Sequence, residues 1–196
     1  MSLVFEFAGS KIKPLQIKEE LASLVKEVRR VNPSTVLEIG TARGGTLFLW
    51  TRLARPDAAI MSIDLPGGKF GNGYSRRREF LYRRFAGKSQ RLHLLRGDSH
   101  SPDTMSEARK FFEGQPLDFL FIDGDHTYEG VKKDWEMYSP LVRAGGVIAF
   151  HDIAEHPPST GCEVARFWNQ IKTLHRHLEI IENPKQGWAG VGVLIK

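Results

Sequence analysis

Short apolar runs alternate with amphipathic segments along this chain, and that alternation limits the folds open to it. The segment 15–31 places apolar residues at helical spacing, while FLFID at 119–123 and VIAF at 147–150 have the length of strands. Strands that alternate with helices pair in parallel through right-handed crossovers. Near-continuous apolar runs fit strands that are buried on both faces. The pattern therefore predicts an α/β fold with a mostly parallel sheet and helices on both of its faces.

The predicted elements form one domain at 1–196, with a helical lead-in at 1–33 and the α/β core at 34–196. The glycine-rich stretch 65–75 is predicted as a loop that is either a lid or a plain surface loop. Strands are expected at 35–40, 58–64, 91–98, 117–124 and 145–152, and a closing strand pair at 177–183 and 190–196. Helices are expected at 15–31, 44–54, 75–86, 101–113, 127–142 and 162–174.

Composition narrows the class of protein. With 196 residues, 41% of them hydrophobic, the chain can bury a core without disulfides, and its single cysteine, Cys162, excludes an internal disulfide. The start MSLVFEF has neither a basic segment nor a long apolar one, and no run approaches the length of a membrane span. We therefore expect a cytoplasmic protein without a signal peptide or a membrane partner.

The net charge of +5 would suit an acidic partner, but it is modest for this length. The densest basic stretch is Arg76, Arg77 and Arg78 with Arg83 and Arg84. We interpret it as the solvated face of a helix, and the alternative is a rim that binds anions.

Acids and glycines follow the first three predicted strands. Glu38 and Gly40 come at the end of the first strand, Asp64 ends the second, and Asp98 with Ser99 follows the third. In parallel sheets, ligands bind at the carboxyl ends of the strands. Each residue also has an ordinary interpretation, since Asp64 could sit in a turn and Asp98 could cap a helix. Their recurrence at successive strand ends favours a binding site.

A second group of polar residues follows the fourth and fifth strands. Asp123 ends one strand, Asp152 ends the next, and His126 and His151 stand close to them in sequence. If the two strands are neighbours, they lie about 4.8 Å apart, and both carboxylates can reach one cation. The group predicts a metal site or an acid–base site. The alternative is that Asp125 and His126 cap a helix that begins near Thr127 and that His151 and Asp152 make loop hydrogen bonds.

Together these residues resemble the motifs of class I methyltransferases that use S-adenosylmethionine (SAM), over residues 35–152. The resemblance implies a Rossmann-like fold with a seven-stranded sheet whose last strand is antiparallel. It also implies that glycines flank the methionine part of SAM, that Asp64 holds the ribose and that Asp98 with Ser99 meets the adenine. The implied cofactor residues are Glu38, Gly40, Thr41, Gly44, Asp64, Asp98, Ser99 and Asp123.

The stretch 119–152 resembles methyltransferase domain family 24 and the metal-dependent O-methyltransferases of macrolide sugars and of the cephalosporin type. That resemblance implies a divalent cation, Mg²⁺ or Mn²⁺, with Asp123, Asp152 and His151 as ligands and His126 as the catalytic base beside Asp123. His151 departs from these families, which have an acid at this position. Magnesium prefers oxygen ligands, so an imidazole would shift the preference toward manganese, iron or zinc.

We therefore expect a SAM-dependent methyltransferase that methylates a hydroxyl of a small metabolite, such as a sugar or an anionic compound, and that could form a homo-oligomer. One alternative is a nucleic-acid methyltransferase, but FIDGDH replaces the Asn-Pro-Pro type of motif after the fourth strand. Another is a SAM-binding protein without catalysis. An NAD-linked oxidoreductase would need the G-x-G-x-x-G fingerprint, which the first turn lacks.

Two further expectations concern aromatic and histidine residues. Trp188 could line the acceptor pocket, although packing in the core is the usual role of a large aromatic side chain. His156, with the prolines that follow it, could also line that pocket. Apart from that alternative for His156, the histidines other than His126 and His151 are expected to be structural: His93, His100, His156, His175 and His177.

Overall fold

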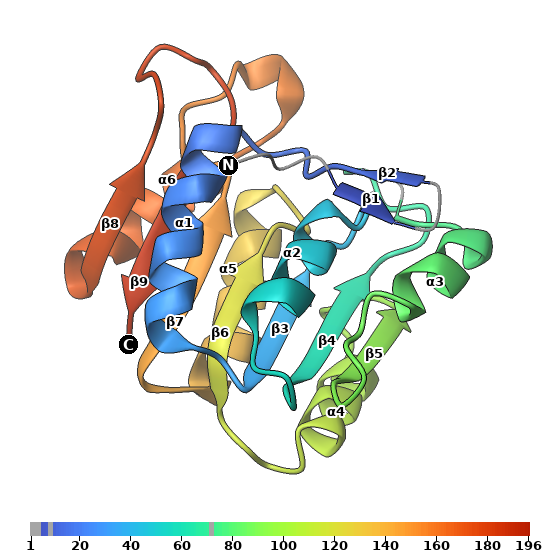
Figure 1. Ribbon diagram of the computed structural model, residues 1–196. Helices are drawn as coiled ribbons and strands as arrows, with labels where there is room; N and C mark the ends of the chain where they lie inside the picture. The colour runs from blue at the N-terminus through green and yellow to red at the C-terminus, as the bar shows by residue number, and fades with distance from the viewer. Residues whose placement is uncertain (1–4, 8–9, 71–72) are drawn as a thin grey trace.

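A seven-stranded sheet runs through the centre of the computed structural model, which describes residues 5–7, 10–70 and 73–196 (Figure 1). The strand order is β5-β4-β3-β6-β7-β9-β8, and β9 alone runs antiparallel to its neighbours in this sheet. This confirms the predicted mostly parallel Rossmann-like sheet. The strands are β3 (Thr35–Ile39), β4 (Ala59–Asp64), β5 (Arg91–Arg96), β6 (Leu117–Ile122), β7 (Val142–His151), β8 (Arg176–Ile180) and β9 (Val191–Ile195).

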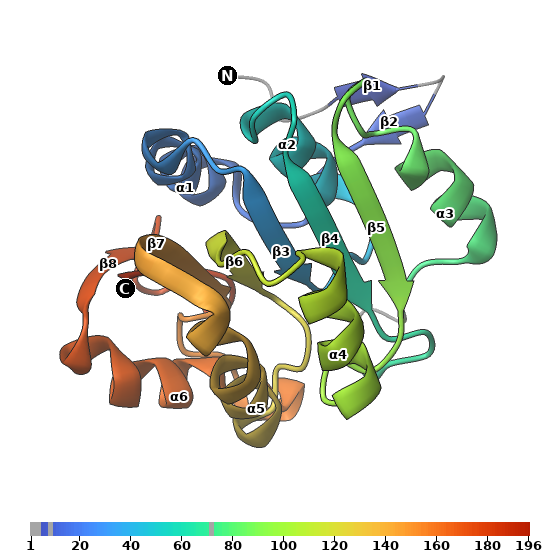
Figure 2. The same ribbon diagram turned by 90° about the horizontal axis from the view of Figure 1, so that it is seen from below.

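Helices cover both faces of the sheet, as predicted. Figure 2 shows α1, α2 and α3 on one side of the sheet and α4, α5 and α6 on the other. The buried apolar side chains accordingly form two clusters, one on each face of the sheet. The helices are α1 (Lys18–Val31), α2 (Gly45–Leu53), α3 (Arg76–Arg83), α4 (Pro102–Phe111), α5 (Tyr128–Tyr138) and α6 (Val164–Ile171).

Strand β6 shows why the sheet is buried on both sides. Its six residues are all buried, and successive side chains of a strand point to opposite faces. Phe119 and Phe121 belong to the cluster under α1 and α2, where the ring of Trp50 meets them edge-on at 4.9 and 5.3 Å between centroids. Leu120 and Ile122 belong to the opposite cluster. Each such side chain contributes about 1.5–3 kcal/mol through burial.

The lead-in differs from the prediction. It begins with two short antiparallel strands, β1 (Phe5–Phe7) and β2 (Ser10–Ile12), that the sequence analysis did not predict. Helix α1 starts at Lys18 instead of residue 15, because the backbone of Ile17 is still extended. The extended stretch before α1 carries Gln16, which donates a hydrogen bond to Asp123.

The predicted helix 127–142 also ends early. Helix α5 stops at Tyr138 and gives way to one 3₁₀ turn, η1 (Ser139–Leu141). Pro140 has no backbone N–H and disfavours a continued α-helix, so β7 can begin at Val142.

The basic stretch lies on a solvent-exposed helix, as its charge pattern predicts. Arg76, Arg77 and Arg78 are exposed on α3, and Arg83 pairs with Glu79 one turn away at 2.6 Å. Within the part of the chain that the structure describes, none of the helices combines the length and the apolar character that crossing a bilayer requires.

Candidate active site

A hollow of about 300 Å³, the first hollow, lies at the carboxyl ends of the parallel strands. Gly40 follows β3, Asp64 ends β4, Asp98 follows β5 and Asp123 follows β6, and all four border it. The parallel pairing of these strands brings residues that are far apart in sequence to one edge of the sheet. The predicted clustering of these strand-end residues is therefore present in the structure.

Asp64 presents an acceptor that lacks a donor. Among the described residues, its Oδ2 atom is buried and has no hydrogen-bond partner. Burial raises the pKa of the Asp64 carboxyl to about 6, although nearby backbone N–H groups, led by that of Thr41, act against it. Buried polar groups nearly always have partners, so an unpaired oxygen beside a hollow fits a ligand that donates hydrogen bonds.

Glu38 lies behind the site and lines neither this hollow nor the next. Its buried carboxyl accepts hydrogen bonds from Trp50 Nε1 at 2.9 Å and from Ser62 Oγ at 2.5 Å. Burial raises its pKa to about 7, although Ser62, Thr46 and Trp50 act against this. The Ser62 hydroxyl is 2.6 Å from Thr41 Oγ1. Glu38 thus supports Thr41 from below, and its predicted contact with SAM stays a prediction.

The two glycines of the first turn are needed for different reasons. Gly40 has φ of +95°, and a Cβ atom there would collide with the carbonyl oxygen of Asp123, so β3 and β6 can approach only with glycine. Gly44 has φ of +73°, and a Cβ atom would lie 2.7 Å from the ring of Tyr82. Gly44 borders neither hollow. Its structural role is to admit Tyr82, and its predicted contact with SAM stays a prediction.

Asp98, Ser99 and His100 form another part of the wall of the first hollow. Asp98 accepts the backbone N–H of His100 at 2.8 Å, and the carbonyl of Ser99 accepts the Tyr138 hydroxyl at 2.7 Å. The sequence analysis treated His100 as structural. Its ring approaches Asp134 at 3.2 Å, and this carboxyl raises the pKa of His100.

A second hollow, of about 250 Å³, adjoins the first. Gly40, Ala42, Phe70 and Asp123 border both, so the two hollows meet at the ends of β3 and β6. The second hollow is also lined by Gln16, Thr41, His126, His151, Asp152 and Trp188.

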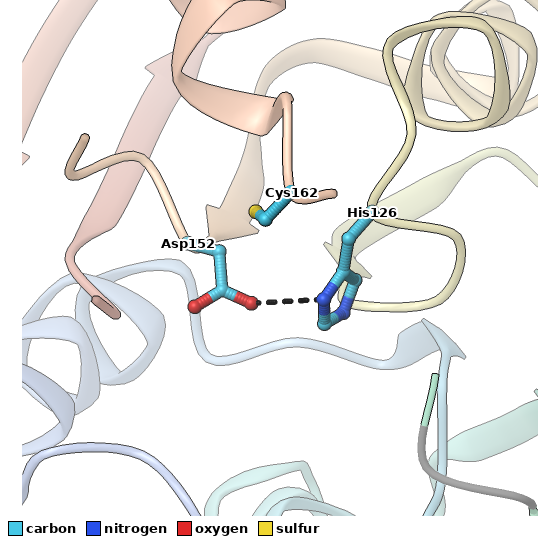
Figure 3. Close-up of side chains that lie close together, drawn as sticks. All are labelled: His126, Asp152 and Cys162. Atoms are coloured by element: carbon cyan, nitrogen blue, oxygen red, sulfur yellow. Dashed lines mark ion pairs between the residues drawn. The ribbon is translucent and has the colours of Figure 1, made fainter. Parts of the chain in front are cut away.

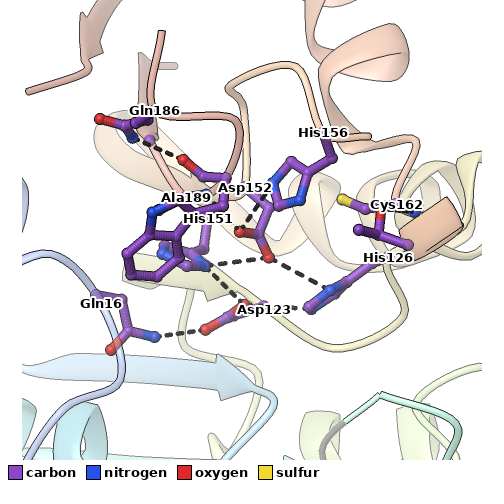
Figure 4. A network of polar contacts seen from close by, with 12 residues as sticks. Gln16, Asp123, His126, His151, Asp152, His156, Cys162, Gln186 and Ala189 are labelled. Atoms are coloured by element: carbon purple, nitrogen blue, oxygen red, sulfur yellow. Dashed lines mark hydrogen bonds and ion pairs between the residues drawn. The ribbon is translucent and has the colours of Figure 1, made fainter. Parts of the chain in front are cut away.

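The acid–histidine cluster consists of Asp123, His126, His151 and Asp152, which border the second hollow together (Figure 4). Because β6 and β7 pair in parallel, their ends place Asp123 and Asp152 on either side of His151. His151 Nδ1 is 3.3 Å from Asp123 Oδ1 and 3.2 Å from Asp152 Oδ2. His126 spans the same pair at 3.4 and 3.3 Å. The predicted convergence of these four side chains is present.

Charge explains how this buried cluster is balanced. Burial alone would raise the pKa of the Asp123 carboxyl, but His151 and His126 outweigh that effect and hold it below its ordinary value. Burial alone would lower the pKa of His151, but the two carboxylates raise it well above its ordinary value. The pKa of His126 is raised in the same way. In the protein alone, the two imidazoles and the two carboxylates thus favour each other's charged forms.

Sequence reasoning missed Gln16 and Cys162 as residues of the site, and it expected His156 to line the acceptor pocket or to be structural, without a contact to Asp152. Gln16 Nε2 donates to Asp123 Oδ2 at 2.7 Å across 107 positions of sequence. His156 Nε2 lies 3.3 Å from Asp152 Oδ1. Cys162 groups with His126 and Asp152, and burial raises the pKa of its thiol to about 11. His156 and Cys162 follow Asp152 by four and ten residues, and this proximity in sequence is the one signal that could have indicated them.

The walls of the second hollow include two aromatic side chains. Phe70 stacks on the ring of His126, with 4.7 Å between centroids. It belongs to the predicted loop 65–75, of which residues 71–72 lie outside the described residues. Trp188 is 46% exposed, so its expected packing in the core is wrong. Trp188 lies in the loop between β8 and β9 and lines the second hollow, which fits the other expectation, that it lines the acceptor pocket.

Residues 37–153 match a family described as a methyltransferase domain, number 24 of that name. The chain belongs to this family. The matched range runs from within β3 to just past the end of β7 and includes the strands whose ends border both hollows. The methyltransferase domain is also 28% identical over 156 residues to the uncharacterized protein y4gI of Sinorhizobium fredii, which covers 77% of this chain and 16% of that protein. It is 29% identical over 124 residues to Tapetum-specific methyltransferase 1 of Arabidopsis thaliana, which covers 63% of this chain and 48% of that protein.

Several solved structures share the fold. Cofactor-bound Rv0187 from MTB has a TM-score of 0.68 at 21% identity, covering 94% of this chain and 83% of its own. The O-methyltransferase from Bacillus cereus in complex with SAH has a TM-score of 0.64 at 18% identity, with coverage of 93% and 84%. MycE from the mycinamycin pathway, in complex with Mg and SAH, has a TM-score of 0.57 at 17% identity, with coverage of 89% and 48%. The fold is that of class I methyltransferases.

Proposed function

We propose that this protein transfers a methyl group from SAM to a hydroxyl oxygen of a small acceptor, such as a sugar or another hydroxylated metabolite, with the help of Mg²⁺ or Mn²⁺. The observation that carries the proposal is the meeting of the two hollows at Asp123. A donor molecule in one hollow and an acceptor in the other would face each other across that junction. Positioning of this kind supplies a large share of the rate of a group transfer.

The first hollow fits SAM in its polar groups. The unpaired Oδ2 of Asp64 would accept from the ribose hydroxyls, and Asp98 with Ser99 lies where the adenine would end. The turn at Gly40 and Thr41 would hold the methionine part. Bound SAM supplies a methyl group on a positively charged sulfur, which is a good leaving group. The support from Glu38 keeps Thr41 in place for that contact.

The second hollow fits a cation and a hydroxyl. Ligand atoms of Asp123, His151 and Asp152 all lie within 4.8 Å of one another. A divalent cation held there would neutralise the carboxylates and favour loss of the acceptor's proton. The neighbour MycE was solved with Mg and SAH, which supports the same pairing of ligands here.

His126 is the proposed base, with Asp123 beside it. An imidazole accepts a proton only in its neutral form, and Asp123 and Asp152 raise the pKa of His126 in the protein alone. Neutralising both carboxylates removes that influence, so His126 could then take the hydroxyl proton. Phe70, stacked on the ring, limits the access of water to it.

Calorimetric titration with SAM tests the cofactor site. Asp64→Asn removes a charged acceptor, and loss of one hydrogen bond to a charged group costs about 1.5–3 kcal/mol, so the affinity should fall about 10-fold to 100-fold. Asp57→Asn is the matched control, because Asp57 is an exposed acid at the other edge of the sheet that pairs with Arg55. If the wild-type chain binds no SAM, the proposed function is wrong.

Methyl transfer from labelled SAM to a panel of sugars and hydroxylated metabolites tests the reaction. Transfer should depend on added Mg²⁺ or Mn²⁺ and stop with a chelator. His126→Asn should lose the activity while SAM affinity stays unchanged, since His126 lines the second hollow and not the first. Transfer that is unaffected by chelation would contradict the role of the cation and leave the role of SAM intact.

A further inference from the structure

Cys162 lies beside the acid–histidine cluster, and no step of the proposed reaction uses it. It precedes α6 and is the single cysteine of the chain. Ligand atoms of Cys162, His126 and Asp152 all lie within 4.8 Å of one another. Figure 3 shows the Asp152 carboxylate facing the His126 imidazole, with the Cys162 sulfur close to both, and 3.3 Å separate His126 Nδ1 from Asp152 Oδ2.

The three donors have the chemistry of a zinc ligand set. Zinc binds sulfur at about 2.3 Å and nitrogen or oxygen at about 2.0–2.2 Å, so ligand atoms around a tetrahedral ion lie about 3.3–3.7 Å apart. The His126–Asp152 separation already fits, and the Cys162 sulfur lies within 4.8 Å of both ligand atoms. Magnesium strongly prefers oxygen ligands, which sets this group apart from the oxygen-rich one.

A second observation points to the same place. The side chain of His156 is nine-tenths buried, with a relative exposure of 9%, and its Nε2 lies 3.3 Å from Asp152 Oδ1. That nitrogen has no hydrogen-bond partner among the described residues. A buried donor nitrogen next to Asp152 could complete a fourth position that water would otherwise fill.

We propose that Cys162, His126 and Asp152 form a second metal site, selective for thiophilic divalent ions such as Zn²⁺, and that filling this site stops methyl transfer. The inhibition rests on the proposed function, whereas the binding does not. Asp152 belongs to both metal groups, and two dications this close would repel each other strongly around only two carboxylates. Occupation of one group therefore excludes the other and also removes His126 as a base.

Cobalt titration of the full-length chain tests the binding directly. Cobalt replaces zinc, and a cobalt–thiolate bond gives a charge-transfer absorption band in the near ultraviolet. Because the chain has one cysteine, such a band can come only from Cys162. The band should saturate at one Co²⁺ per chain and disappear when one equivalent of Zn²⁺ is added. No band at saturating Co²⁺ would overturn the proposal.

Variants separate the site from a thiol that binds metal by itself. Cys162→Ser should abolish the band, and His126→Ala should weaken Co²⁺ binding at least about tenfold, as loss of even an outer-shell partner does. His177→Ala is the control, because His177 is exposed on β8, outside both metal groups, and should leave the titration unchanged. A band of unchanged affinity in His126→Ala would also overturn the site.

Activity measurements test the regulatory part. With Mg²⁺ or Mn²⁺ present, Zn²⁺ should inhibit the wild-type chain, and Cys162→Ser should need at least about ten times more Zn²⁺ for the same inhibition. Equal inhibition of both chains would refute the regulatory role. A cobalt band in a chain that transfers no methyl group would leave the site standing and refute the proposed function. Methyl transfer by a chain that shows no cobalt band would leave the proposed function standing and refute the second metal site.

Discussion

Gly40→Ala is the substitution whose cost follows most directly from the geometry. Gly40 combines a φ of +95° with a position where a Cβ atom would collide with the carbonyl oxygen of Asp123. Gly114 is the matched control, because its φ is +73° and nothing lies within 4 Å of the place of its Cβ atom. Alanine at Gly114 therefore meets only the backbone cost, and alanine at Gly40 meets the same cost and the collision.

The magnitudes follow from these two contributions. A left-handed backbone costs a residue with a Cβ atom about 1–2 kcal/mol, and relief of an overpacked contact costs about 1–3 kcal/mol. We expect Gly114→Ala to lose about 1–2 kcal/mol of unfolding free energy and Gly40→Ala about 2–5 kcal/mol. For a domain of this size, 1 kcal/mol shifts Tm by about 2–4 °C, so the excess loss at Gly40 is about 2–12 °C.

Thermal unfolding followed by circular dichroism measures this difference. The same shift at the end of β6 would displace Asp123, so SAM affinity should also fall in Gly40→Ala and stay unchanged in Gly114→Ala. Equal Tm losses in the two variants would refute the argument that close approach of β3 and β6 requires glycine.

Three further predictions concern carboxyl groups that are buried or hydrogen-bonded: those of Glu38, Asp64 and Asp118. Burial raises the pKa of Glu38 to about 7 from an ordinary 4.5, so the unfolded chain ionises first and stability should fall by about 3 kcal/mol as pH rises through that window. Urea unfolding at pH 5 and pH 8 should show this fall in the wild type and a smaller fall in Glu38→Gln, in which Asp64, with its pKa raised to about 6, still contributes. Burial raises the pKa of Asp64 to about 6, and the ribose hydroxyls of SAM need its ionised form as an acceptor. Calorimetry should therefore show that the affinity for SAM falls as pH drops below about 6 in the wild type and does not change with pH in Asp64→Asn. The Asp118 carboxylate accepts hydrogen bonds from Ser34 and Arg143 at the amino end of β6, so Asp118→Ala should lower the free energy of unfolding in urea by about 2–4 kcal/mol. A large change in the SAM affinity of this variant would contradict the position of Asp118 far from the hollows.

The histidines and acids at strand ends were predictable because parallel strands have a simple geometry. Asp123 and Asp152 end two strands joined by one helical crossover, and such strands become neighbours in most α/β sheets. Asp64 and Asp98 follow the same rule on the other side of β3. For these residues the periodicity of the sequence was enough to bring the side chains to one edge.

Glu38 shows where that rule stops. Its place before Gly40 predicts contact with the cofactor, and that contact stays a prediction, but its buried carboxyl also accepts hydrogen bonds from Trp50 and Ser62. The hydrogen bonds of Trp50 and Ser62 decide its role. Neither partner can be read from the motif.

Local periodicity was enough to predict the order of the elements, the faces of the strands and the acids at the strand ends. The tertiary structure alone decided what surrounds the cluster. Gln16 reaches Asp123 from the lead-in, and buried Glu20 binds the backbone of Glu182 and Gly190, which sets the loop whose Ala189 N–H donates to Asp152. These contacts join segments more than 30 residues apart, and the path of irregular loops, which has no periodic signal, determines them.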